Sequence, residues 1–75
     1  MDIYIIYNDK WECPYDGYDS HVVIANNRTE VVLLAQEIAA DEGKNIWVDA
    51  NIVIQGIYTG DRTNPFILLS SFNAG

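Results

Sequence analysis

A single helix-forming segment lies between two pairs of strand-forming segments in a chain of only 75 residues. Asn27 stands three residues before Glu30. This is the spacing of a capping box, in which two side chains bond to backbone amides that are free at the start of a helix. Gly43 is well placed to end the helix in a left-handed conformation. The pattern therefore predicts a helix from Asn27 to about Glu42.

The segments before and after this helix are rich in β-branched and aromatic residues, which favour strands. We expect strands over residues 2–8, 21–25, 52–59 and 66–70. The order β-β-α-β-β predicts one α+β domain over residues 1–75, with two layers: an antiparallel four-stranded sheet and one helix on one face. The first two strands can form a hairpin across 9–20, and the last two can form one across 59–65. Gly56 is a candidate for a bulge.

Both faces of the expected sheet are apolar. Strands one, three and four carry apolar residues on both of their alternating sets, so the second face needs a cover. The aromatic loop 9–20, a second copy of the chain or a partner could provide it. At 100° per residue, four apolar side chains share one face of the helix: Val31, Leu34, Ala35 and Ile38. Their expected partners in the sheet are Ile5, Ile24 and Ile54 or the neighbouring strand residues.

The charge balance restricts the class of partner. Eleven acidic residues face four basic ones, for a net charge of −7. This disfavours direct binding to nucleic acid, which requires Lys and Arg, and to anionic membranes. The favoured partner is a basic protein. The alternative is that the negative charge only keeps a small protein soluble.

Several sequence features bear on the location of the protein. The N-terminal segment has no basic leader, and no apolar stretch is long enough to cross a membrane. The chain has a single cysteine, Cys13, which excludes a disulfide within one chain. We therefore expect a cytoplasmic protein without a signal peptide or a transmembrane helix.

The residues needed for catalysis or metal binding are sparse. A Cys13–His21 dyad is conceivable, but the acidic neighbours Glu12 and Asp16 disfavour the thiolate that a nucleophile requires. Glu12, Asp16 and Asp19 share one loop, yet their spacing does not match a calcium-binding loop. We expect no catalytic residue, no cofactor and no metal.

Two segments are candidates for partner binding. On the helix, Glu30, Glu37 and Asp41 share one flank, and the apolar Leu33 lies on the outer face. In the loop, acidic and aromatic residues alternate: Asp9, Trp11, Glu12, Tyr15, Asp16, Tyr18 and Asp19. Aromatic side chains supply contact area, and carboxylates pair with Arg and Lys across an interface. The alternative is that the aromatic residues are core and the acids simply face water.

The YDGYDS segment (15–20), the Asn27-capped helix and the ending ILLSSFNAG (67–75) are similar to short phage-encoded accessory proteins. The chain resembles the small acidic anti-CRISPR and anti-defence inhibitors among them. This resemblance implies a non-enzymatic inhibitor in the host cytoplasm that acts as a DNA mimic. Its partner would be a CRISPR-type defence protein, bound at a basic nucleic-acid-binding surface. No functional residue can be carried over from it.

Two other functions remain open. The first is a structural or assembly subunit that forms a homodimer or larger homo-oligomer through the apolar sheet face. The second is a small regulator that binds a metal or a ligand.

Overall fold

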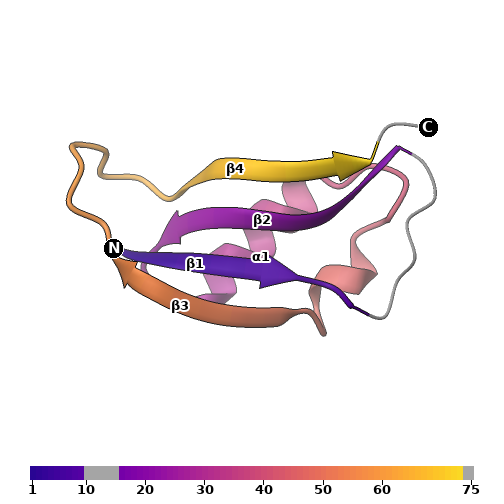
Figure 1. Cartoon of the computed structure of the whole chain (residues 1–75), viewed down its shortest axis with the longest axis horizontal. Helices are drawn as coiled ribbons and strands as arrows, with labels where there is room; N and C mark the ends of the chain where they lie inside the picture. The colour runs from indigo at the N-terminus through magenta and orange to yellow at the C-terminus, as the bar shows by residue number, and fades with distance from the viewer. Residues whose placement is uncertain (10–15, 74–75) are drawn as a thin grey trace.

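Four strands and one α-helix follow one another in the order β-β-α-β-β, which confirms the predicted α+β fold (Figure 1). The computed structural model describes residues 1–9 and 16–73. Its elements are β1 (Asp2–Tyr7), β2 (Gly17–Ala25), α1 (Arg28–Glu37), a short 3-10 helix η1 (Asn45–Trp47), β3 (Asn51–Ile57) and β4 (Phe66–Asn73).

The sheet has the strand order β3-β1-β2-β4, and every neighbouring pair is antiparallel. The predicted hairpin between the first two strands is confirmed. A hairpin between the last two strands is wrong, because β3 and β4 form opposite edges of the sheet. The β1–β2 hairpin has two free edges, and one of the later strands pairs with each of them. Residues 58–65, rich in turn-forming residues, therefore run across the end of the sheet from one edge to the other (Figure 1).

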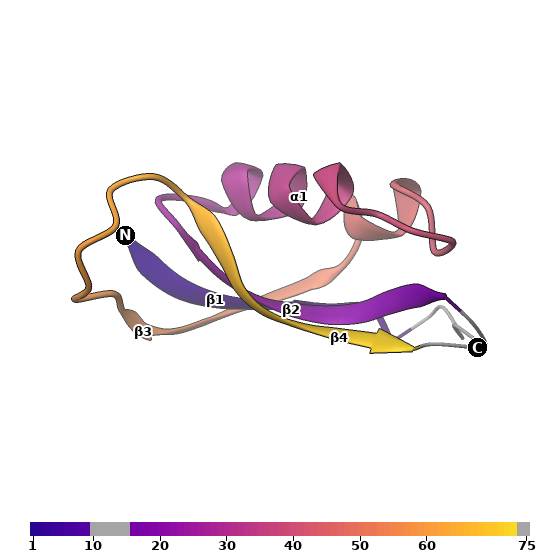
Figure 2. The same ribbon diagram turned by 90° about the horizontal axis from the view of Figure 1, so that it is seen from above.

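β2 and β3 are both antiparallel to β1, which lies between them, so they run parallel to each other. This is a split β-α-β arrangement, and α1 is the connection that returns the chain over one face of the sheet. Figure 2 shows α1 and η1 on the same side of the sheet. In the described part of the chain, no helix covers the opposite face, which we call the open face.

The helix begins as predicted. Asn27 has an extended backbone, and its Oδ1 accepts a hydrogen bond of 3.0 Å from the Glu30 N–H. Glu30 Oε1 accepts a bond of 2.7 Å from the N–H of Asn26. Two backbone amides near the helix start are thus satisfied, in a variant of the capping box in which Glu30 bonds to the residue before the N-cap.

The predicted helix end is wrong. α1 stops at Glu37, with Ile38 as its C-cap, rather than at Glu42. Gly43 does have a left-handed backbone, with φ at 78°, but its N–H bonds to the Ala40 carbonyl in a separate turn. The carboxylate of Glu42 accepts a bond from the N–H of Ala40, and this contact stabilises a non-helical path.

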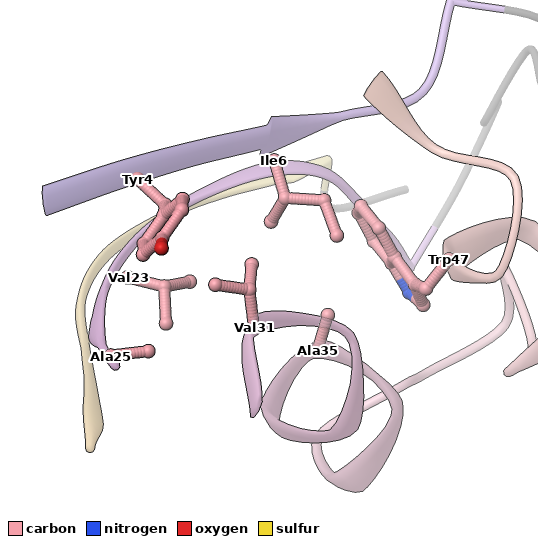
Figure 3. Packing of buried hydrophobic residues seen from close by; sticks show 7 residues of the cluster. All are labelled: Tyr4, Ile6, Val23, Ala25, Val31, Ala35 and Trp47. Carbon is pink, nitrogen blue, oxygen red and sulfur yellow. The ribbon is translucent and has the colours of Figure 1, made fainter. Parts of the chain in front are cut away.

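The core lies between α1 and the sheet (Figure 3). It consists of Tyr4, Ile6, Val23, Ala25, Val31, Ala35 and Trp47. Val31 and Ala35 are fully buried, as the helical spacing predicts, and Leu34 is partly buried. The prediction is wrong for Ile38, which is 38% exposed because the helix ends one residue before it.

The helix packs against the strand neighbours of the sheet residues named as its expected partners, and not against those residues themselves. Strand alternation points Tyr4 and Ile6 toward the helix, so Ile5 faces the other way. Ile54 lies on an edge strand and is 59% exposed. Ile24 is buried, as expected, but it stands between two core residues of β2 and therefore belongs to the opposite face.

Both edge strands expose large apolar side chains: Val53, Ile54 and Ile57 on β3, and Leu68, Leu69 and Phe72 on β4. Each edge strand also carries an irregularity. In β3 the register shifts between Gly56 and Ile54, which leaves Gln55 as an extra residue and confirms a bulge beside Gly56. In the β2–β4 pair the register shifts twice, with Leu68 as the extra residue of β4 and Asp19 as the extra residue of β2.

Candidate functional site

The topology gathers most of the acidic residues at one end of the sheet. β1 ends there, β2 and β3 begin there, and α1 runs back toward it. We call this region the acidic end, and its residues are Asp9, Asp16, Asp19, Glu37, Asp41, Glu42 and Asp49. Within the described ranges, Lys44 is the one basic residue near this end. Arg28 and Arg62 lie toward the opposite end together with Asp2, Glu30 and Asp61, so the net negative charge is concentrated at the acidic end.

Two acids predicted on different elements are neighbours. The Asp41 N–H donates a hydrogen bond of 3.0 Å to the backbone carbonyl of Asp16. Asp16 has a φ of 52°, in the left-handed region, which an aspartate tolerates better than most residues. Both residues are exposed. The segment after α1 is therefore fastened to the start of β2, with two carboxylates at the junction.

Amide and hydroxyl groups orient two further carboxylates. Asn51 Nδ2 donates a bond of 3.2 Å to Asp9 Oδ1. Asp19 accepts bonds from Asn73 Nδ2, at 3.3 Å, and from Ser20 Oγ, at 3.0 Å. Neutral donors position a carboxylate without cancelling its charge. The acidic end therefore presents fixed negative groups from several strands.

The predicted acidic stripe on the helix forms only in part: α1 includes Glu30 and Glu37 but not Asp41. Glu30 lies at the N-terminus of α1, at the far end from Glu37, and its carboxylate caps the helix. Asp41 lies beyond the helix altogether. The physical reason is that α1 ends at Glu37, so the angular spacing of a helix no longer applies to Asp41. Glu37 is exposed and remains a candidate contact.

Leu33 is exposed on α1, as expected, with 58% of its surface accessible. It lines a shallow cavity of about 290 Å³ between α1 and the chain that enters β3. The other lining residues are Arg28, Thr29, Val32, Val48, Ala50 and Ile52. Val48 is 61% exposed, so an apolar patch borders this cavity on both sides.

The aromatic loop is only partly described. Trp11, Glu12 and Tyr15 lie outside the described residues. Tyr18 packs toward the core, with its ring centroid 4.9 Å from that of His21 and 4.8 Å from that of Phe72. Tyr18 thus fits the alternative in which the aromatic residues are core, and it does not cover the open face.

A buried glutamate fastens the acidic end to the core, and sequence reasoning missed it. Glu42 Oε1 accepts bonds from the N–H groups of Tyr18, at 3.1 Å, and Ala40, at 2.9 Å. Its Oε2 accepts a bond of 3.0 Å from Trp47 Nε1. Three donors stabilise the buried carboxylate. No pattern in the sequence separates Glu42 from the other acids, because its partners come from three segments.

His21 is the other buried polar residue, with 1% of its surface exposed. Its Nδ1 lies 2.7 Å from Ser70 Oγ, and its ring packs against Trp47. Nε2 has no hydrogen-bond partner within the part of the chain that the structure describes. Burial lowers the pKa of His21, against the opposing effect of the nearby Glu42 and Asp19 carboxylates.

A serine–histidine contact can activate a nucleophile when a third group orients the histidine. Here the nearby Glu42 carboxylate bonds to Trp47 and to two backbone amides instead. The contact between His21 and Ser70 therefore lacks the orienting partner of a hydrolase site. Cys13, the other candidate nucleophile, lies outside the described residues.

Comparison with protein-family models, curated proteins and solved structures finds no match. Over residues 1–9 and 16–73, no group of three or more His, Cys, Asp and Glu residues is arranged to hold a metal ion. Within the same ranges, no helix has both the length and the apolar character needed to span a bilayer. Any proposal about function therefore rests on the geometry and charge of the surface described above.

Proposed function

We propose that the protein is a non-enzymatic inhibitor that binds another protein at a basic, nucleic-acid-binding surface. Its partner would be a host defence protein of the CRISPR type, and the chain would be phage-encoded. The observation that supports this best is the acidic end, where carboxylates from the start of β2, the end of α1 and the segment after α1 lie together.

Carboxylates on a rigid scaffold compete with phosphates for the same Arg and Lys side chains. The acidic end has this rigidity. The backbone bond between Asp41 and Asp16 joins two of its segments, and Glu42 fastens both to Trp47. Negative groups held in place lose less entropy on binding than groups on a flexible tail. The acidic end would therefore act as a DNA mimic.

An apolar contact beside the charges would supply further affinity. Leu33 lies one helical turn before Glu37, and both side chains are exposed. Charged pairs at the rim of an interface chiefly set the rate of association, whereas buried apolar anchors slow dissociation. In the proposed complex, Leu33 is such an anchor, and Glu37 and Asp41 lie at its charged margin.

The test is a capture experiment followed by a competition assay. The immobilised protein is incubated with nuclease-treated bacterial lysate at about 50 mM and about 200 mM salt, where phosphate-like contacts differ strongly in strength. Each captured protein is purified, and its binding to a labelled nucleic acid is measured as this protein is added. We expect a basic protein that releases its nucleic acid and whose capture falls as the salt concentration rises.

A matched pair of variants tests the location of the binding surface. Glu37→Lys with Asp41→Lys changes the acidic end, whereas Asp2→Lys with Asp61→Lys makes the same change of charge elsewhere. We expect a large loss of binding only for the first pair. Equal losses of binding would show that binding depends only on net charge. No loss of binding from either pair would overturn the proposal.

A further inference from the structure

The chain contains one Asp-Gly step, formed by Asp16 and Gly17 at the start of β2. In such a step the backbone nitrogen of the glycine can attack the side-chain carboxyl group of the aspartate. Glycine favours this attack because it has no side chain to block the approach and has a permissive backbone. No other aspartate or asparagine in the sequence precedes a glycine. Asp16 is therefore the residue whose sequence context most favours this reaction.

The backbone of Asp16 is also strained. Its φ of 52° makes Asp16 the one non-glycine residue with a left-handed backbone among residues 1–9 and 16–73. This conformation costs energy in any residue with a side chain, although aspartate tolerates it better than most. A rearrangement that takes the main chain away from this geometry releases the strain. Asp16 is exposed as well, so water reaches its carboxyl group.

Asp19 provides a comparison within the same strand, because it precedes another small residue, Ser20. Both oxygens of its carboxylate are held. Oδ1 accepts a hydrogen bond of 3.0 Å from Ser20 Oγ, and Oδ2 accepts one of 3.3 Å from Asn73 Nδ2. The carboxyl group must leave these donors before it can meet the backbone nitrogen of Ser20. The fold therefore protects Asp19 from the reaction that Asp16 can undergo.

We propose that Asp16 is a site of spontaneous conversion to isoaspartate through a cyclic succinimide. The nitrogen of Gly17 forms a bond to Cγ of the protonated Asp16 carboxyl group, and the proton of the nitrogen leaves with the carboxyl hydroxyl as water. One water molecule then adds to the ring. Addition at the main-chain carbonyl carbon breaks its bond to nitrogen and gives isoaspartate, whereas addition at Cγ restores aspartate. One water is lost and one is gained, so no other reactant is needed.

The conversion changes the junction that joins two segments of the acidic end. The main-chain carbonyl of Asp16 accepts the hydrogen bond of 3.0 Å from the Asp41 N–H. In isoaspartate the main chain runs through Cβ and Cγ instead, so it gains one atom and this carbonyl becomes part of a side-chain carboxylate. The number of charges stays the same. Conversion should therefore loosen the contact between the start of β2 and the segment after α1 without changing the net charge.

The first experiment incubates the folded protein in heavy-oxygen water at about pH 6, where a small share of carboxyl groups is protonated. Each passage through the ring adds one heavy oxygen atom, and peptide mass spectrometry locates it. We expect residue 16 to react at least about tenfold faster than residue 19, which must first break two hydrogen bonds. The difference should narrow when the chain is unfolded in guanidinium chloride. No reaction at residue 16, or equal rates at both residues in the folded protein, would overturn the proposal.

Two variants of the exposed Asp16 test the ring intermediate. Asp16→Asn closes the same ring with loss of ammonia, so its intact mass should change to that of the aspartate form. Asp16→Glu keeps the carboxylate but would need a larger and less favourable ring, so residue 16 should gain neither heavy oxygen nor an isomerised peptide. An Asp16→Asn variant whose mass stays constant would contradict the proposed ring closure.

The last measurement concerns the effect on the acidic end. Amide hydrogen exchange of Asp41 is followed by nuclear magnetic resonance in fresh protein and in protein that has been incubated. We expect exchange to become several-fold faster in the converted parent, as the loss of one hydrogen bond implies, and to stay unchanged in Asp16→Glu. Unchanged exchange in converted protein would exclude the loosening. No partner protein is involved, so these results do not depend on the proposed inhibition.

Discussion

The indole Nε1 of Trp47 donates a hydrogen bond of 3.0 Å to the carboxylate of Glu42 inside the protein. Trp47 is fully buried and Glu42 is 5% exposed. The same carboxylate receives the backbone N–H groups of Tyr18 and Ala40. One side chain thus connects β2, the segment after α1 and η1, and much of the geometry of the acidic end depends on it.

Glu42→Ala should therefore destabilise the protein strongly. It leaves three N–H groups without their acceptor, and each buried unpaired donor costs about 1–3 kcal/mol. We expect a loss of about 3 kcal/mol or more in the free energy of unfolding, measured by urea denaturation with circular dichroism. Glu37→Ala is the control, because Glu37 is exposed, and it should change stability by less than about 0.5 kcal/mol. Equal effects of the two variants would contradict the role of Glu42.

Stability should fall as the pH is lowered through the range of histidine titration. Burial lowers the pKa of His21 below its ordinary value of 6.5. Below that value the unfolded chain binds a proton that the folded protein resists, so acid favours unfolding. We expect less stability at about pH 5.5 than at about pH 7, with a slope of at most about 1.4 kcal/mol per pH unit.

The matched variant for this pH dependence is His21→Phe. Phenylalanine keeps an aromatic ring beside Tyr18 and Trp47 but has no proton to bind. Urea denaturation of both proteins at the two pH values gives the comparison. The slope should disappear in the variant, and a slope that persists would assign the effect to other groups.

Truncation of a buried core side chain should lower the stability of the protein, whereas truncation of an exposed side chain should not. Ile6 is fully buried in the cluster between α1 and the sheet. Ile6→Ala should cost about 2–5 kcal/mol, from lost burial and the cavity left behind. Leu33→Ala removes an exposed side chain and should leave the melting temperature nearly unchanged. A melting temperature for Ile6→Ala within a few degrees of the parent would place Ile6 outside the core.

The contribution of the N-cap of α1 to stability can be measured with two neighbouring asparagine variants, one of which serves as the control. Asn27→Ala removes the side-chain oxygen that accepts the Glu30 N–H. The expected cost is about 1 kcal/mol, the usual value for loss of an N-cap. Asn26→Ala keeps the backbone N–H that bonds to Glu30, so it should cost much less. Thermal unfolding followed by circular dichroism distinguishes the two.

The parts of the fold that could be predicted from the sequence depend on local chemistry. The start of α1 is an example, since Asn27 and Glu30 are three residues apart and bond to neighbouring amides. The strands are another, because β-branched runs favour an extended chain in any setting. The bulge of β3 lies at Gln55, next to the glycine that marked this part of the strand as a candidate.

The parts that could not be predicted depend on contacts between distant residues. The pairing of β4 with β2 joins positions such as His21 and Ser70, and the turn-rich segment 58–65 is compatible with either a hairpin or a crossing. The end of α1 depends on Glu42, whose partners lie on three segments. For the same reason, the acidic stripe expected on one helix forms only in part, and the acidic end is built from several elements.

The position of β4 has a consequence for synthesis. Every other strand of the sheet precedes it in the chain, and its partner β2 lies some fifty residues upstream, as the pairing of His21 with Ser70 shows. While the chain emerges from the ribosome, β1, β2, α1 and β3 can assemble, but one edge of β2 stays uncovered until residues 66–73 have left the exit tunnel. During that interval β2 presents an apolar edge to neighbouring nascent chains. Translation speed between β3 and the end of β4 should therefore affect the yield of correctly folded protein.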